Sequence, residues 1–159
     1  MMEVNIITVG KIKENYIING INEYSRRLSS YCNLNIIEVK EAKIDKDNQK
    51  ASERIKKKEG QRLLDKLPDR GYDIALDASG KPMTSEGLAK SINNLQVQGY
   101  SRLNFIIGGS LGLSGELLEK VDYSLSLSRM TFTHQMIRLI LLEQLYRAFK
   151  IKAGEPYHK

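Results

Sequence analysis

The sequence predicts an α/β fold in which a mostly parallel sheet is covered by helices on both faces. Short apolar runs that are typical of buried strands alternate with segments of helical periodicity along the whole chain. The 159 residues suit one domain, and no repeat or low-complexity segment interrupts them. Loops rich in glycine and small polar residues follow three of the predicted strands. We therefore expect a single domain spanning residues 1–159, with a ligand site along one edge of its sheet.

The first half of the chain predicts three strands and two helices. Strands are expected at 3–9, 33–39 and 72–76, because each is a short apolar run ended by polar residues or glycine. A helix is expected over 13–28, where apolar side chains recur at helical spacing. A second, very polar helix is expected up to about residue 67, with Asp47 as its cap and Pro68 ending it. Its few apolar side chains place it on the surface.

The second half continues the alternation. Thr84 or Ser85 can cap a helix through about residue 97, and a strand over 103–107 runs straight into a glycine-rich stretch at 108–112. A short helix over 114–120 and a strand over 123–127 follow. The last helix is expected over 133–152, closed by Gly154.

The formal net charge of +6 is concentrated in two stretches. Residues 50–66 hold seven basic and three acidic side chains, and residues 129–159 hold six basic and two acidic ones. Local basic patches suit a polyanion such as nucleic acid, although Lys56, Lys57 and Lys58 alone suit a solvated helix face equally well.

Cysteine content and hydropathy indicate the cellular compartment and exclude some kinds of site. Cys32 is the only cysteine and there are two histidines, so neither an intrachain disulfide nor a zinc site is expected. No segment approaches the roughly 20 apolar residues that a membrane span needs, and the N-terminus does not read as a secretory signal. We therefore expect a cytoplasmic protein without membrane or metal partners.

Three loops should meet at the carboxyl edge of the sheet and form a pocket: residues 77–80, 108–112 and 128–133. The glycine-rich stretch lacks the G-x-G-x-x-G pattern, because Ser110 occupies the place of the second glycine, and it lacks the ending of a P-loop. Its glycines fit a tight turn as well as a ligand loop. In residues 127–132, small polar groups alternate with Met130 and Phe132, as a site for adenine and ribose would require.

The last helix is apolar over more than the roughly 100° stripe that a surface helix buries. A central position within the domain would cover its second side, but we favour a homodimer built on this helix. Arg138, Glu143, Gln144 and Arg147 are its polar exceptions, and Glu143 can pair with Arg147 at i, i+4. The tail over 154–159 is either a frayed end or, through its Tyr-His-Lys ending, a group that stacks on a base and holds a phosphate.

Several motifs carry a resemblance to a known family. In chain order they are Leu76-Asp77-x-x-Gly80, Phe105-Ile106-Ile107-Gly108-Gly109-Ser110-x-Gly112, Leu127-Ser128-x-Met130-Thr131-Phe132-x-His134-Gln135, Arg138, Glu143-Gln144-x-Tyr146-Arg147-Ala148 and Tyr157-His158. In order and spacing they resemble the RlmH family, small bacterial methyltransferases of the SPOUT class that modify a pseudouridine of 23S ribosomal RNA at N3. The likeness spans essentially the whole chain, and residues 127–147 are its most specific part.

The resemblance implies a SPOUT-type fold whose C-terminal part, about residues 72–159, forms a trefoil knot, and an obligate homodimer. It implies S-adenosyl-L-methionine as the cofactor and 23S rRNA within the assembled ribosome as the partner. The cofactor residues would be Leu76, Gly108, Leu127, Ser128, Arg129, Met130, Thr131 and Phe132. The catalytic residues would be Arg147, Tyr157 and His158, reaching the cofactor of the other protomer.

In that reaction Arg147 would favour the developing imide anion, and His158 or solvent would accept the proton, while Tyr157 would stack on or orient the base. Candidates for holding RNA are Lys11, Lys13, Lys56, Lys57, Lys58 and Arg62, with a solvated surface as the competing interpretation. Two other functions fit the same residues: a nucleotide-binding protein without RNA activity, and a non-enzymatic dimer associated with the ribosome.

Overall fold

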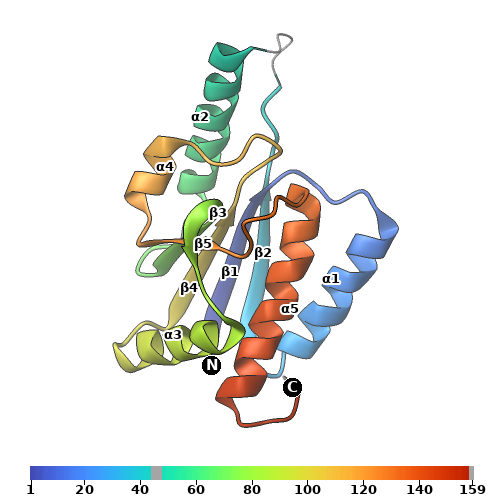
Figure 1. Ribbon diagram of the computed structural model, residues 1–159, viewed down its shortest axis with the longest axis vertical. Helices are drawn as coiled ribbons and strands as arrows, with labels where there is room; N and C mark the ends of the chain where they lie inside the picture. The colour runs from blue at the N-terminus through green and yellow to red at the C-terminus, as the bar shows by residue number, and fades with distance from the viewer. Residues whose placement is uncertain (44–47, 158–159) are drawn as a thin grey trace.

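The computed structural model describes residues 1–43 and 48–157, which form one five-stranded sheet and the helices around it (Figure 1). The strands are β1 (Met2–Val9), β2 (Cys32–Val39), β3 (Tyr72–Pro82), β4 (Arg102–Ile107) and β5 (Tyr123–Ser126). The helices are α1 (Asn15–Leu28), α2 (Gln49–Asp65), α3 (Ser85–Val97), α4 (Gly115–Lys120) and α5 (His134–Lys152). The sheet order is β2-β1-β4-β3-β5 and every neighbouring pair is parallel, which confirms the predicted fold class.

The two faces of the sheet carry separate apolar clusters. Ile6 of β1 belongs to the cluster packed by α1, α3 and α5, whereas Ile7 belongs to the cluster packed by α2 and α4. Both side chains are fully buried, because successive residues of a strand point to opposite faces and both faces are covered. Figure 1 shows α1 and α5 on one side of the sheet and α2 and α4 on the other.

Helix α5 occupies a central position within the domain. It packs between α1 and α3 above the sheet, and five of its apolar side chains are buried there: Leu141, Leu142, Leu145, Ala148 and Phe149. This placement accounts for much of the helix's apolar width, the alternative that the sequence left open. Among the described residues, neither α5 nor any other helix combines the length and hydropathy needed to span a membrane.

The expected boundaries are right in most elements and wrong in β3. That strand continues to Pro82, and its pairing with β5 shifts register between Leu76 and Lys81, so residues 77–80 form an irregularity within the strand instead of ending it. A Cβ at Gly80 would lie 2.6 Å from the backbone oxygen of Ser124, so only glycine fits this close approach. Asn48 caps α2 by accepting from the N–H of Ala51; the expected cap, Asp47, lies outside the described residues.

The segment 127–133 leaves β5 at the edge of the sheet and returns to α5, which lies over the middle of it. On the way it shares a cavity with the loop that follows the central strand β4. A knotted chain would need such a returning path, and the trefoil knot itself stays a prediction.

A ladder of polar side chains crosses the sheet at one register level. Asn35 of β2 donates to Asn5 of β1 at 3.0 Å, Asn5 donates to Asn104 of β4 at 2.9 Å, and Asn104 donates to Asp73 of β3 at 2.9 Å. Each pair is also a register pair of the sheet. Asn5 and Asn104 are buried, so a shift of register would strand buried amides without partners. The ladder therefore specifies how the strands align.

We expect Asn104→Leu to lower the free energy of unfolding by about 2–4 kcal/mol, because the hydrogen bonds with Asn5 and Asp73 are lost and one N–H of the buried Asn5 amide loses its acceptor. Chemical denaturation measures the change. Asn35→Ala is the matched control: it removes the exposed end of the same ladder and should cost less than about 1 kcal/mol. Equal losses in the two variants would contradict a role for the buried centre of the ladder.

Candidate functional site

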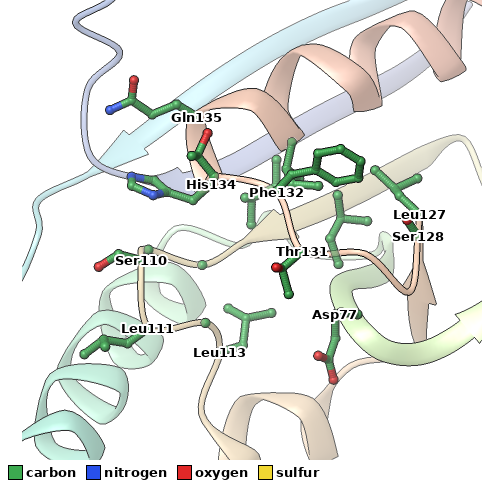
Figure 2. A pocket seen from close by; sticks show the side chains of 18 of the residues that line it. Asp77, Ser110, Leu111, Leu113, Leu127, Ser128, Thr131, Phe132, His134 and Gln135 are labelled. Atoms are coloured by element: carbon green, nitrogen blue, oxygen red, sulfur yellow. The ribbon is translucent and has the colours of Figure 1, made fainter.

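A cavity of about 970 Å³ lies at the carboxyl edge of the sheet (Figure 2). Its wall comes from residues 76–78 of β3, from 107–113 after β4 and from most of 127–137 after β5. All three stretches that the sequence placed at this edge contribute to the wall, so the predicted pocket is confirmed, although residues 77–80 belong to β3 and only 77 and 78 of them line the cavity. Figure 2 shows the side chains of these loops surrounding one hollow, with His134 and Gln135 at the start of α5 closing one side.

Two apolar side chains of the cavity wall are unusually exposed to solvent. Met130 is 75% exposed and Phe132 is 44% exposed, although both line the cavity. Leu76, Leu113 and Leu127 contribute further apolar surface. A hollow that combines such apolar surface with polar side chains, here including Ser128 and Thr131, suits a flat heterocycle joined to a sugar.

The glycine loop (residues 108–112) has a geometry that side chains would prevent. A Cβ on Gly108 would lie 2.7 Å from the carbonyl carbon of Gly112 and 2.8 Å from its oxygen. The N–H of Gly112 donates to the carbonyl of Gly109 at 3.0 Å, and Gly112 has a φ of +86°. The loop therefore turns back on itself so tightly that backbone takes the place of a side chain at Gly108.

The structure brings seven of the eight predicted cofactor residues into the cavity wall: Leu76, Gly108, Leu127, Ser128, Met130, Thr131 and Phe132. Arg129 is exposed and does not line the cavity. The loop around it is shaped locally: Ser126 Oγ donates to the carbonyl of Ser128 at 3.0 Å, and the N–H of Met130 donates to Ser128 Oγ at 3.0 Å. The role of these residues toward a cofactor stays a prediction.

The sequence reasoning missed a fourth contribution, from the start of α1 and of α5. Glu14, Tyr16, His134 and Gln135 also line the cavity. The loop after β1 ends at the same edge as the others, so the rule that located the three loops could have found it. Burial lowers the pKa of the His134 imidazole below its usual range, and Arg138 lowers it further against an opposing effect of Glu41. The lowered pKa favours the neutral form of the His134 ring at pH 7.

A buried arginine fixes the end of α5 that borders the cavity. Arg138 is 2% exposed; its Nη1 donates to Glu38 of β2 at 2.6 Å, and its Nη2 donates to Thr8 Oγ1 at 3.2 Å and to the carbonyl of Gly10 at 3.1 Å. These contacts tie the first turns of α5 to the carboxyl ends of β1 and β2. His134, one turn earlier, is thereby held at the cavity.

A buried carboxyl group packs against the glycine loop. Glu59 of α2 is 5% exposed; its Oε2 accepts from the N–H of Ala42 at 3.2 Å, and its Oε1 has no hydrogen-bond partner among the described residues. A Cβ on Gly109 would lie 3.0 Å from Oε1, so the carboxyl packs directly against the loop. Burial raises the pKa of Glu59, the Ala42 N–H and Arg62 oppose that rise, and Glu41 adds to it. The sequence indicated only an acidic residue within a polar helix.

We expect Glu59→Gln to be more stable than the wild type at pH 8, with the difference shrinking toward pH 5. A carboxyl whose pKa is raised on folding contributes stability below its unfolded pKa, about 4.3, and loses it as pH rises through the folded pKa. Glutamine stays neutral throughout and keeps an acceptor for Ala42. Denaturation at both pH values measures the difference, with Glu116→Gln on the surface of α4 as control. A variant destabilised equally at both values would contradict the effect.

A second group of candidate residues lies at the C-terminal half of α5. We call it the tail cluster: the rings of Tyr24, Tyr31, Tyr146, Phe149 and Tyr157 with the cations of Arg27, Arg147 and Lys150. The Tyr146 and Tyr157 rings meet edge to face at 4.8 Å, and the Arg147 guanidinium lies 4.9 Å from the centre of the Tyr157 ring. Aromatic rings interleaved with cations suit unstacked bases and phosphates of RNA.

Glu143 organises the predicted catalytic residues within this cluster. Its Oε1 accepts from Arg147 Nη2 at 2.5 Å, the i, i+4 pair that the sequence predicted, and from Tyr157 Oη at 3.2 Å. Tyr157 Oη also lies 3.3 Å from Tyr24 Oη. Burial, the hydrogen bond with Tyr24 and the charge of Glu143 raise the pKa of Tyr157, so its phenol stays neutral. His158, the third predicted catalytic residue, lies outside the described residues.

The cavity and the tail cluster are far apart in one chain. His134 at the cavity and Arg147 are thirteen positions apart on the same helix, which at about 1.5 Å per residue is roughly 20 Å. In Figure 1, α5 runs from the carboxyl edge of the sheet to the edge where the chain's N-terminus lies. One protomer therefore does not bring Arg147 and Tyr157 to its own cavity.

The candidate RNA-holding residues also divide between two places. Lys11 and Lys13 are exposed in the loop after β1, next to the cavity residue Glu14. Lys56, Lys57, Lys58 and Arg62 lie on α2, on the other face of the sheet from α5. Lys56 pairs with Glu53 at 2.8 Å and Arg62 donates to the carbonyl of Lys40 at 2.8 Å, whereas Lys57 and Lys58 are exposed. In the part of the chain that is described, no group of three or more His, Cys, Asp or Glu side chains could hold a metal ion.

Comparisons with known proteins agree along the full length of the chain. A family described as "Predicted SPOUT methyltransferase" matches residues 2–158. A protein of Halothermothrix orenii named ribosomal RNA large subunit methyltransferase H is 62% identical over 159 residues, which cover 99% of this chain and 100% of that protein. Proteins of the same name from Clostridioides difficile and Bifidobacterium adolescentis are 55% and 52% identical with the same coverage.

Two solved structures share the fold at low sequence identity. A probable methylase family protein from Haemophilus influenzae gives a TM-score of 0.56 at 13% identity, over 100% of this chain and 72% of that one. A probable methyltransferase from Bordetella pertussis gives 0.55 at 11% identity, over 93% and 96% of the two chains. At these identities the likeness concerns the fold alone.

Proposed function

Because the chain belongs to the RlmH family of SPOUT methyltransferases, we propose that it transfers a methyl group from S-adenosyl-L-methionine to N3 of a pseudouridine in 23S rRNA of the assembled ribosome. The observation that carries this proposal is the cavity formed by residues 76–78 of β3 and by the segments that follow β4 and β5. An rRNA substrate also places the enzyme in the cytoplasm. The alternative function, nucleotide binding without RNA activity, would not explain the aromatic and cationic side chains of the tail cluster.

The residues around the cavity fit the cofactor. Its volume of about 970 Å³ is ample for a nucleoside with an amino-acid chain, and the exposed apolar surfaces of Met130 and Phe132 can cover the adenine. The glycine loop brings backbone close enough to donate and accept hydrogen bonds without side chains in the way. Leu76 of β3 and Leu127, the first residue after the neighbouring strand β5, would enclose the ring from the protein side.

When bound, the cofactor supplies an electrophilic methyl group on its sulfonium. The chain's own residues then have two tasks: to hold the base in line with that methyl group and to make loss of the N3 proton favourable. Arg147 serves the second task, because a guanidinium stabilises the negative charge that develops on the imide. Glu143 keeps that guanidinium in a fixed orientation through their 2.5 Å ion pair.

The proton acceptor is His158 or solvent and not Tyr157. The raised pKa of Tyr157 keeps its hydroxyl protonated, so it cannot act as a phenolate base at neutral pH. Its ring, which already packs against Tyr146 and Arg147, suits stacking on or orienting the target base. An imidazole with an ordinary pKa of about 6.5 is mostly neutral at pH 7 and can accept the proton.

A homodimer would complete the active site. The roughly 20 Å between the cavity and Arg147 along α5 leaves the two halves of the proposed site unconnected within one protomer. Two copies packed with their α5 helices antiparallel would place the tail cluster of each beside the cavity of the other. This separation supports the dimer more strongly than the apolar character of α5, which its place between α1 and α3 largely explains.

The proposal is tested by a methyl-transfer assay with isotopically labelled cofactor on ribosomes that lack the modification, followed by mapping of the modified nucleotide. We expect one labelled pseudouridine in 23S rRNA. Label on another RNA or on protein would disprove the substrate. Cofactor binding without any transfer would favour a nucleotide-binding protein, and absence of cofactor binding in calorimetry would favour a non-enzymatic dimer on the ribosome.

A further inference from the structure

The C-terminal tail is not a frayed end up to Tyr157; its backbone is directed by a defined helix stop. Gly154 has a φ of +70°. The N–H of Glu155 donates to the carbonyl of Lys150 at 3.0 Å, and the N–H of Gly154 donates to the carbonyl of Ile151 at 3.0 Å. This pair of bonds is a Schellman motif, which ends a helix and turns the chain back along it. Residues after Gly154 therefore return toward the side of α5 that carries Glu143 and Arg147.

A side-chain latch then holds the returning tail. Glu155 Oε2 accepts from Lys150 Nζ at 2.7 Å and from Tyr31 Oη at 2.9 Å. Lys150 also lies 5.6 Å and 5.8 Å from the ring centres of Tyr31 and Tyr146. Tyr31 comes from the segment between α1 and β2, so the latch joins three separate parts of the chain. Charge-assisted bonds to one carboxylate from two sides restrict the tail more than either bond alone would.

We propose that Glu155, Lys150 and Tyr31 are positioning residues, which hold the tail so that Tyr157 meets the target base beside Arg147. This inference rests on the proposed function and deepens it. Only Pro156, whose φ is restricted by its ring, separates Glu155 from Tyr157, so the position of one limits the position of the other. Tyr157 in turn reaches Glu143 and Tyr24 with its hydroxyl and Arg147 with its ring. Without the latch, these contacts alone would have to order the end of the chain.

The test uses the full chain and two independent readouts. Hydrogen exchange of the C-terminal peptide reports how firmly the tail is held, and methyl transfer on unmodified ribosomes gives kcat and KM. For Glu155→Ala we expect faster exchange and a kcat lowered about ten- to a hundredfold, since small misplacements of reacting groups have effects of that order. Cofactor affinity should stay unchanged, because none of the three latch residues belongs to the cavity wall. Tyr31→Phe, which removes only the hydroxyl, should change both readouts in the same direction by less.

A charge exchange separates positioning from general stability. The double variant Lys150→Glu with Glu155→Lys keeps the net charge and restores an ion pair between the same two positions, and the Tyr31 hydroxyl can accept from the new lysine. It should recover part of the kcat that Glu155→Ala loses. Glu116→Ala, which removes a glutamate from an exposed pair with Lys120 on α4, is the matched control and should behave like the wild type.

The outcomes are distinguishable. Unchanged exchange in Glu155→Ala would overturn the latch whatever the activity, and faster exchange with unchanged kcat would overturn its role in positioning. The three residues would have only a structural role if Glu155→Ala also lost thermal stability or cofactor affinity and if the charge-exchanged double variant recovered no kcat. If the wild type itself transfers no methyl group, the proposed function fails and the positioning role with it, while the exchange data still report whether the latch exists.

Discussion

Gly108→Ala is expected to weaken binding of S-adenosyl-L-methionine about five- to a hundredfold, and with it methyl transfer at low cofactor concentration. The new Cβ would lie 2.7 Å from the carbonyl carbon of Gly112, a backbone atom that cannot rotate away. The glycine loop would have to open, which breaks the bond between Gly112 N–H and the Gly109 carbonyl. Overpacking of this kind costs about 1–3 kcal/mol, and 1.4 kcal/mol corresponds to a factor of ten in affinity.

Isothermal calorimetry with the cofactor measures the effect, and circular dichroism shows whether the variant is folded. Gly115→Ala is the matched control, because it makes the same substitution a few residues later where no atom lies within 4 Å of the new Cβ. That control should bind cofactor like the wild type. If Gly108→Ala bound equally well, the glycine loop would not belong to the cofactor site.

Arg147→Met is expected to lower kcat about 10²- to 10³-fold while leaving cofactor affinity unchanged. Methionine keeps much of the packing against Tyr157 but removes the charge that favours the imide anion, and loss of one such stabilising group typically has this effect. Single-turnover methylation at saturating RNA measures it. Arg147→Lys, which keeps the charge but loses the planar geometry of the pair with Glu143, should fall between wild type and Arg147→Met. Unchanged turnover in both would remove Arg147 from the mechanism.

The same two substitutions test whether the site is shared between protomers. A Gly108→Ala protomer retains its tail cluster, and an Arg147→Met protomer retains its cavity. In a dimer of one of each, one of the two sites combines an intact cavity with an intact tail cluster. At a cofactor concentration too low for Gly108→Ala to turn over, mixing the two variants should therefore restore up to about half of the activity per heterodimer. If mixed samples stayed inactive although size and mass analysis showed heterodimers, the shared site would be disproved.

Local chemistry made the elements readable in the chain. Thr84, one of the two expected caps, does cap α3, because the hydroxyl of an extended residue accepts from the N–H three positions on. Ser114, which the sequence placed inside the next helix, caps α4 in the same way. Gly154 ends α5 for the equally local reason that glycine adopts a positive φ. The cavity was predictable because the carboxyl ends of parallel strands meet at one edge, so the loops at 108–112 and 127–132 had to come together.

Contacts between distant segments were not readable in this way. Glu59 resembles any surface glutamate of a polar helix until the fold places it against Gly109. Asn5, Asn35 and Asn104 look like interruptions of apolar strands until parallel pairing brings them to one level. The residues after Leu76 suggested a strand end, because only the later pairing with β5 shows the strand resuming at Lys81.

By itself, the sequence determined the α/β class, the order of the elements and the edge at which a ligand would bind, because these follow from periodicity, caps and the rule for parallel strands. The motifs over 127–147 also determined the family. Only the tertiary structure decided that Arg147 and Tyr157 lie roughly 20 Å along α5 from the cavity and that Lys150, Glu155 and Tyr31 hold the tail. Sequence patterns report on residues a few positions apart. The distance between the cavity and Arg147 and the contacts that hold the tail depend instead on how the whole of α5 crosses the sheet and on which distant side chains it meets.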